Sequence, residues 1–253
     1  MVPVVIREIS PFFLLLLGAT VGGAVLAAVG TGAVLVAGIV LVVLGGWAVS
    51  LCLHEFAHAY TAWRFGDRDV EARGYLTLNP LKYSHPLLSL GLPALFIALG
   101  GIGLPGGAVY VRTSWMTKRQ KTLVSLAGPA TNLAFAVVVL ALTGLLREPG
   151  HPVFWAAMAF MGFLQVTAFV LNMLPVPGLD GYSALEPHLS PQTQRALEPA
   201  KQWGFIILVV LLFTPQINRW FFELVFWFVE LFGVPGGLAM AGMDLTRFWS
   251  AWF

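Results

Sequence analysis

Charge is scarce in this sequence, and cysteine is almost absent. Only 10% of the 253 residues are Asp, Glu, Lys or Arg and the net charge is +2, whereas an ordinary soluble domain carries roughly 25% charged residues. There is also no basic tract interleaved with aromatic residues, so we expect no nucleic-acid partner. The single cysteine, Cys52, excludes an intrachain disulfide. Hydrophobic residues make up 58% of the chain, which indicates a protein embedded in a lipid bilayer.

Several apolar runs are long enough to cross a membrane. A hydrocarbon layer of about 30 Å requires roughly 20 helical residues, and four runs meet this length. Two shorter runs near the carboxyl end, separated by Pro215, are expected to be short spans or a hairpin that does not fully cross. The predicted spans are residues 12–30, 33–64, 123–146, 153–174, 205–213 and 220–232.

Two segments between the spans are expected to be irregular. Residues 70–73 and 75–78 flank Gly74 and predict a short β-hairpin at the membrane surface. Glycines and a proline interrupt the apolar run 87–104, which favours a re-entrant segment. We therefore predict an all-α polytopic membrane protein with about six transmembrane helices, a short β-hairpin and a re-entrant segment. It would be one membrane-embedded domain, residues 1–253, with a core at 33–181 and accessory carboxyl-terminal helices at 182–253.

The distribution of Lys and Arg predicts the orientation, because loops facing the cytoplasm collect these residues. With six spans and a re-entrant 87–104 segment, twelve of the fourteen Lys and Arg residues fall on one side of the membrane. The exceptions are Arg147 and Arg219. We expect both termini and the carboxyl end of the second span to face the cytoplasm of a bacterial-type cell membrane. The twelve are Arg7, Arg64, Arg68, Arg73, Lys82, Arg112, Lys118, Arg119, Lys121, Arg195, Lys201 and Arg247.

The pentapeptide His54-Glu55-Phe56-Ala57-His58 lies near the carboxyl end of the second span. Residues four apart share a helix face, so His54 and His58 can bind one metal ion. Glu55 stands where a general base would act on water at that metal, as in the HExxH arrangement. Ionisable side chains in so apolar a segment indicate function. The sequence therefore predicts one zinc ion per chain, with His54 and His58 as ligands.

A third protein ligand is needed, and residue chemistry alone leaves it open. Asp180 is distinguished by its setting between prolines, which end a span, and glycines, which allow close approach of the backbone. The full set of candidates is His85, Asp180, Glu186, His188, Asp67, Asp69 and Glu71.

Four motifs in order resemble the site-2 protease family of intramembrane zinc metalloproteases, in particular its compact bacterial members without a PDZ domain. They extend over residues 51–181 and combine the HEFAH pentapeptide with three further segments. These are Leu76-Thr77-Leu78-Asn79-Pro80, Ala127-Gly128-Pro129-Ala130-Thr131-Asn132, which is similar to a GPxxN motif, and the segment from Asn172 to Gly181, which is similar to an NxxPxxxLDG motif.

The resemblance implies that Asp180 is the third zinc ligand and Glu55 the catalytic base. It also implies that Asn132 contacts the substrate or its oxyanion, and that Asn172 takes part in substrate binding. Helix-to-helix hydrogen bonds are the alternative for both asparagines. His85 stands where relatives often have an acidic residue. The implied substrates are single-span membrane proteins, cleaved in or near their transmembrane segments within the lipid bilayer. The alternative function is a zinc transporter or sensor without hydrolysis.

Overall fold

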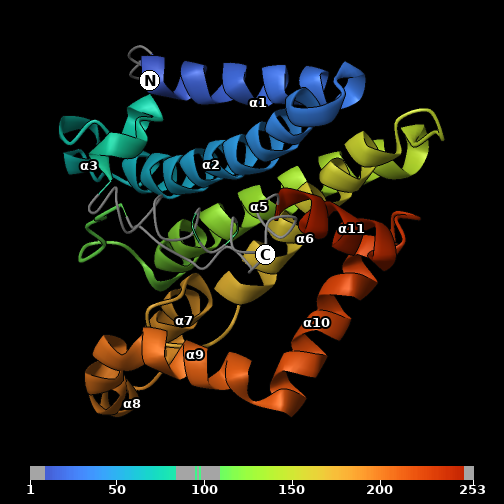
Figure 1. Ribbon diagram of the computed structural model, residues 1–253. Helices are drawn as coiled ribbons and strands as arrows, with labels where there is room; N and C mark the ends of the chain where they lie inside the picture. Colours follow the sequence, from blue (N-terminus) through green and yellow to red (C-terminus); the bar gives the residue numbers. More distant parts are fainter. Residues whose placement is uncertain (1–8, 84–94, 96, 98–108, 248–253) are drawn as a thin grey trace.

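The computed structural model describes residues 9–83, 95, 97 and 109–247, and within them it is an all-α protein (Figure 1). The predicted re-entrant segment, apart from the helical Leu95 and Ile97, lies outside the described residues, as does His85. No β-strand occurs in the part of the chain that is described.

Four helices among the described residues are long and apolar enough to cross a membrane: α1 (Pro11–Val29), α2 (Gly32–Arg64), α5 (Lys118–Leu146) and α6 (Pro152–Asn172). They correspond to the four long apolar runs, so that part of the prediction is confirmed. Local signals fix where two of them begin. The Ser10 hydroxyl accepts a hydrogen bond from the Phe12 N–H before α1, and Thr117 and Gln120 form a capping box before α5. The chain is a multi-pass membrane protein.

The helices α1 and α2 form a tight antiparallel hairpin because glycines face each other across it. A Cβ at Gly23 would lie 2.6 Å from the Val42 nitrogen, and one at Gly38 would lie 2.4 Å from the Ala27 nitrogen. Neither position can carry a side chain without separating the helices. Close backbone approach of this kind stabilises helix pairs in lipid, where burial of apolar surface drives association only weakly.

The predicted β-hairpin is wrong. Its first half is a helical turn, α3 (Asp69–Ala72), and its second half is a 3-10 turn, η1 (Tyr75–Thr77). The Asp67 carboxylate accepts a hydrogen bond from the Asp69 N–H at the start of α3, and Gly74 and Leu78 end the turns with φ of 75° and 58°. Tyr75 and Leu76 are both buried. Two consecutive buried side chains fit a turn packed on α2 but not a strand with alternating faces.

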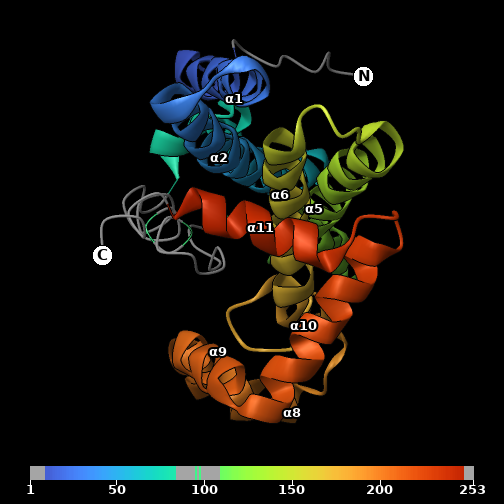
Figure 2. The ribbon, with the colours of Figure 1, turned by 45° about the vertical axis from the view of Figure 1, so that its right-hand side comes forward.

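The segment after α6 consists of shorter elements. These are α7 (Asp180–Leu185), η4 (Glu186–His188), α8 (Pro191–Leu197), η5 (Glu198–Trp203), α9 (Gly204–Phe213), α10 (Pro215–Glu230) and α11 (Gly236–Thr246). In both ribbon views α8 and α9 lie at the end of the molecule opposite α1, and α11 crosses α6 (Figure 2). A Cβ at Gly242 would lie 2.0 Å from the Ala156 carbonyl oxygen, so α11 contacts α6 closely.

The two short predicted spans are not full-length spanning helices. With a rise of 1.5 Å per residue, the 10 residues of α9 extend over about 15 Å and the 16 of α10 over about 24 Å. The segment Pro191–Trp203 together with Ile206–Phe213 would count as a fifth span, bent by 77°. The described residues thus provide four or five candidate spans, and six remains a prediction.

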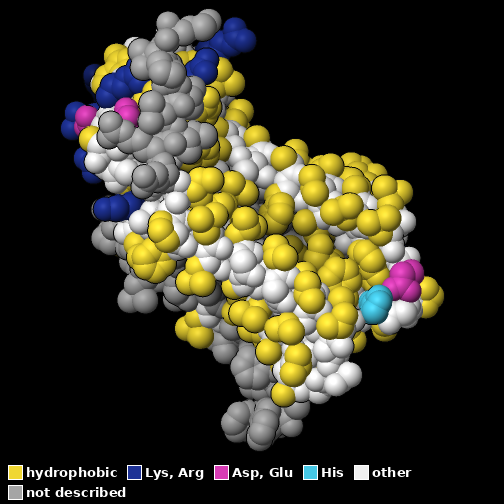
Figure 3. All heavy atoms as spheres, turned by 90° about the horizontal axis from the view of Figure 1, so that it is seen from above, with side chains coloured by type: hydrophobic (Ala, Val, Ile, Leu, Met, Phe, Trp, Pro, Cys, Tyr) yellow, Lys and Arg dark blue, Asp and Glu magenta, His cyan; other side chains and the backbone are white. Residues whose placement is uncertain are grey.

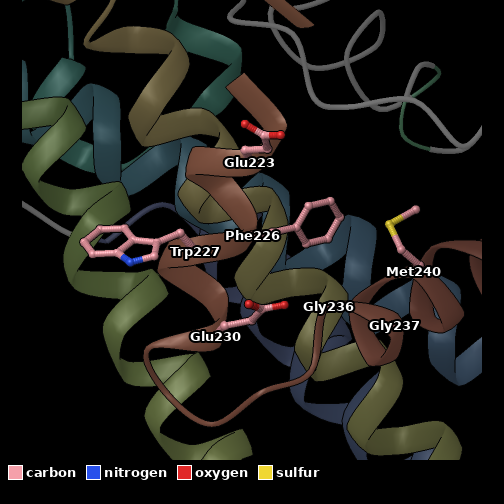
Figure 4. A pocket seen from close by; sticks show the side chains of 7 residues that line it. All are labelled: Glu223, Phe226, Trp227, Glu230, Gly236, Gly237 and Met240. Atoms are coloured by element: carbon pink, nitrogen blue, oxygen red, sulfur yellow. The ribbon is translucent and has the colours of Figure 1, made fainter. Parts of the chain in front are cut away.

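The outer surface agrees with a lipid environment. Hydrophobic side chains are spread over the described part of the face seen in Figure 3, and Lys and Arg side chains gather at one end of it. A cleft of about 470 Å³ opens between α10 and α11 (Figure 4). Its lining residues are Glu223, Phe226, Trp227, Glu230, Gly236, Gly237 and Met240.

Candidate metal centre

His54 and His58 lie one turn apart on the face of α2 that is turned toward α5. Both are buried, with 6% and 8% of their surface exposed. Their Nε2 atoms are 3.1 Å apart. The helical spacing of four residues therefore brings two ring nitrogens to one point inside the helix bundle, as the sequence predicts.

Asp180 reaches the same point from a different element. It is the first residue of α7, and its Oδ2 lies 3.3 Å from His54 Nε2 and 3.4 Å from His58 Nε2. Two features place the start of α7 there. A Cβ at Gly181 would lie 2.3 Å from the Met173 carbonyl oxygen, so α7 passes against the end of α6, and the Thr122 hydroxyl donates to the Ala184 carbonyl and ties α7 to α5.

The other ring nitrogen of each histidine is held by α5. His58 Nδ1 lies 2.7 Å from the Val124 carbonyl oxygen, and His54 Nδ1 lies 2.6 Å from Asn132 Oδ1. A carbonyl oxygen only accepts, so each Nδ1 carries the proton of a neutral ring and each Nε2 has a free lone pair. Both histidines are thus held in the tautomer that ligates through Nε2.

The three donor atoms fit a zinc ion. Two neutral imidazole nitrogens and one carboxylate oxygen are a common zinc set, and tetrahedral bonds of about 2.05 Å put the ligand atoms about 3.3 Å apart. The observed separations of 3.1, 3.3 and 3.4 Å match that edge.

Gly128 leaves the α5 side of the cluster bare. A Cβ at this position would lie 2.2 Å from His58 Nε2 and 2.5 Å from His54 Nε2. Gly128 stands midway between Val124 and Asn132, one helical turn from each. The same stretch of α5 therefore orients both rings and leaves its own side of their Nε2 atoms open.

Glu55 follows His54 on α2 and is buried, with 3% of its surface exposed. Its Oε2 accepts a hydrogen bond of 2.9 Å from the Val109 N–H. It lies next to a ligand histidine on the same helix, although it is not one of the clustered donors. A carboxylate that lies next to such a cluster without joining it can take a proton from water there.

Three curated proteins are similar to the chain over long stretches. The proteins named "Putative zinc metalloprotease Rip2" from Mycolicibacterium smegmatis and Mycobacterium tuberculosis are 65% and 62% identical to it, over 96% of this chain and 95% of each relative. "Putative zinc metalloprotease YwhC" of Bacillus subtilis is 34% identical over 66% of this chain and 78% of its own. The chain belongs to the site-2 protease family of zinc metalloproteases. The family resemblance of the four motifs is confirmed. No family model and no solved structure matches the chain.

In this site-2 protease, His54, His58 and Asp180 are the described His, Cys, Asp and Glu side chains that come together as a group able to hold a metal. The other described candidates for the third ligand have different partners. Glu186 pairs with Lys201, His188 with Thr122, Asp69 and Asp67 with Arg112, and Glu71 with Trp63.

The two asparagines differ in how far their side chains are bonded within the protein. Both amide protons of Asn132 are donated within the protein, to Ser50 Oγ and to Gln165 Oε1, each at 3.0 Å. No donor is left for a substrate oxyanion, so the structure favours the alternative of a hydrogen bond between helices for this residue. Asn172 is half-buried at the end of α6, and its side chain forms no hydrogen bond with any described residue, so its part in substrate binding stays a prediction.

Sequence reasoning missed Ser50, Gln165 and the role of Gly128 in this protease. A signal was present for the first two. Ser50 lies one turn before His54 on the same helix face, and Gln165 is a lone amide within an otherwise apolar stretch of α6. Polar side chains in such positions need partners inside the bundle.

Proposed function

We propose that this chain hydrolyses peptide bonds in or near the transmembrane segments of membrane proteins. A zinc ion would be held by His54, His58 and Asp180, and Glu55 would act as the general base. The observation that carries the proposal is the convergence of three donor atoms, from two buried histidines and the half-buried Asp180, with tetrahedral spacing beside a carboxylate that does not join them. The names of the relatives, which include "zinc metalloprotease", support it.

Each residue of the site would have one task. Bound zinc supplies a Lewis acid that polarises a carbonyl and lowers the pKa of water toward about 7. Val124 and Asn132 keep the Nε2 atoms of His58 and His54 available as ligands. Glu55 accepts a proton from the water that attacks the scissile carbonyl and then delivers it to the leaving amine. The Val109 N–H, bonded to Oε2, orients this carboxylate.

The substrates would be single-span membrane proteins. A transmembrane helix hides its own peptide bonds in its hydrogen-bonding pattern, so the substrate must unwind locally before Glu55 can act. Residues 70–78 are helical turns and provide no strand edge for pairing with an unwound substrate.

The site would lie within the bilayer, toward the cytoplasmic side. Arg64 ends α2 ten residues after His54, which corresponds to about 15 Å along the helix. The twelve-to-two distribution of Lys and Arg supports cytoplasmic termini. A sixth crossing would have to combine short elements, since α10 alone is shorter than the hydrocarbon layer.

The test uses purified full-length protein in proteoliposomes with a single-span model substrate. Wild-type protein should retain one zinc per chain and cleave the substrate. Glu55→Gln should retain zinc yet lose cleavage by several orders of magnitude, because the amide cannot accept the proton. Glu148→Gln, in the exposed loop between α5 and α6, is the matched control and should cleave normally. Cleavage by Glu55→Gln at the wild-type rate, or zinc flux without cleavage by the wild type, would contradict the proposal.

A further inference from the structure

Three polar side chains lie behind His54, on the side away from Asp180, and come from three different helices. Ser50 of α2, Asn132 of α5 and Gln165 of α6 are all buried, with 1%, 4% and 0% of their surface exposed. Asn132 donates to Ser50 and Gln165 and accepts from His54, and Ser50 also donates to Gln165 Oε1. The four side chains form one connected network within apolar helices.

Met161 determines which atoms of this network donate and which accept, because it fixes the orientation of the Gln165 amide. Gln165 Nε2 lies 3.8 Å from Met161 Sδ, one turn earlier on α6. A thioether sulfur carries no proton and can only accept, so the amino group of Gln165 faces Met161 and its oxygen faces Asn132. Two donors then meet that oxygen, from Ser50 and from Asn132 Nδ2.

The orientation of the two amides determines which nitrogen of the His54 ring carries the proton. With Asn132 Nδ2 bonded to Gln165, the Asn132 oxygen faces His54 Nδ1, which must carry the proton. With both amides reversed, Asn132 Nδ2 would donate to His54 Nδ1 and the ring proton would move to Nε2. The atom that faces Asp180 and His58 would then be protonated and could not bind a metal.

We propose that Gln165, oriented by Met161 and assisted by Ser50, is a positioning residue for the metal centre. It fixes the amide of Asn132 and so keeps His54 Nε2 available as a ligand. This inference rests on the proposed function, which makes His54 a zinc ligand. The two histidines are held differently. The Val124 carbonyl cannot reverse and fixes His58 alone. His54 is held by Asn132, whose amide in turn depends on Gln165, Ser50 and Met161.

The competing explanation is that the network only joins helices α2, α5 and α6. Hydrogen bonds between membrane helices do stabilise their packing. Such a role would change unfolding but not the affinity for metal. Zinc affinity and the absorption spectrum of bound Co²⁺ therefore separate the two explanations.

The experiment measures zinc affinity of the full-length protein in detergent by competition with a chelator. Gln165→Leu should bind zinc about 10-fold more weakly or worse, the usual effect of losing an outer hydrogen-bond partner, and should alter the Co²⁺ spectrum. Thr167→Val is the matched control on the same helix. Thr167 is fully buried, and its hydroxyl has no partner among the described residues, so this variant should bind zinc like the wild type.

A double-mutant cycle tests the route through Asn132. In an Asn132→Ala background, Gln165→Leu should have almost no further effect on zinc affinity, because the relay of hydrogen bonds from Gln165 through Asn132 to His54 is already broken. If the two substitutions lowered zinc affinity independently, so that their fold-changes multiplied in the double variant, the proposal would be overturned. Met161→Leu, which keeps the apolar volume but removes the sulfur, should weaken zinc binding less than Gln165→Leu and serves where the latter does not fold.

The outcomes separate this inference from the proposed function. A wild-type protein with no zinc affinity would refute the proposed function and the relay with it. If the wild type binds zinc and Gln165→Leu binds it with the same affinity, the positioning role of Gln165 is overturned while the proposed function stands.

Discussion

Replacing Gly128 by alanine is the most direct test of how the helices build the metal centre. An ordinary van der Waals contact begins at about 3.4 Å, and the new Cβ would lie 2.2 Å from His58 Nε2, so it is about 1.2 Å too close. Nε2 is the proposed ligand atom, buried at the end of a ring whose other nitrogen is already bonded. Either the ring or α5 must therefore move.

A movement of α5 would break the support of both rings. The bonds from His58 to Val124 and from His54 to Asn132 are 2.7 and 2.6 Å long. A displacement of about 1.2 Å along them would stretch both beyond the roughly 3.2 Å limit of a hydrogen bond. Loss of one outer partner weakens metal binding about 10- to 100-fold. Loss of both should weaken it at least about 100-fold, which corresponds to about 2.7 kcal/mol.

The assay is zinc content and chelator competition for Gly128→Ala in detergent, with thermal unfolding measured in parallel. Gly22→Ala on α1 is the matched control, because a Cβ at that position has nothing within 4 Å. It should leave zinc affinity unchanged and stabilise the helix slightly. If Gly128→Ala bound one zinc with wild-type affinity, the geometry argued for the site would be wrong.

Three further predictions follow from other parts of the structure. Gly181→Ala should push α7 away from the end of α6 and weaken zinc binding through Asp180 while the histidine pair remains, as measured by chelator competition. Asp67→Asn should destabilise residues 109–112, because the buried carboxylate accepts the Arg112 N–H at 2.6 Å and the Asp69 N–H at 3.1 Å. We expect a loss of about 1–3 kcal/mol, visible as faster hydrogen exchange there but not in α6. Removal of zinc by a chelator should lower the unfolding temperature of the wild type, by an amount that corresponds to about 2.7 kcal/mol when free zinc had been 100-fold above its dissociation constant.

The four long helices could be predicted from sequence because the constraint on them is local. A run of about 20 apolar residues in lipid must satisfy its own backbone hydrogen bonds, and only a helix does so within one segment. The shared face of His54 and His58 followed equally from helix geometry. The prediction of a β-hairpin at residues 70–78 was wrong because the conformation there depends on Asp67 and on packing against α2. The alternation of residue types along the chain does not reveal either contact.

The third metal-binding residue could not be identified from the local sequence. Asp180 lies near His54 only because α7 rests against α5 and α6, a contact that spacing along the chain does not encode. Family resemblance pointed to Asp180, and the structure brings its carboxylate to the histidines. Gln165 was missed for a related reason. Its partners lie on α2 and α5, so its importance appears only when three helices are assembled.

The position of Asp180 at the start of a short, separate helix has a consequence for the whole chain. An ion held jointly by α2 and α7 would be a removable cross-link between residues 54 and 180, in a protein whose single cysteine can form no disulfide within it. A link that closes a loop of about 100 residues stabilises a fold by roughly 4.7 kcal/mol through the unfolded chain alone. The same ion that activates water would then also hold α7 against the membrane helices, so that folding of this region and readiness for catalysis would be gained and lost together.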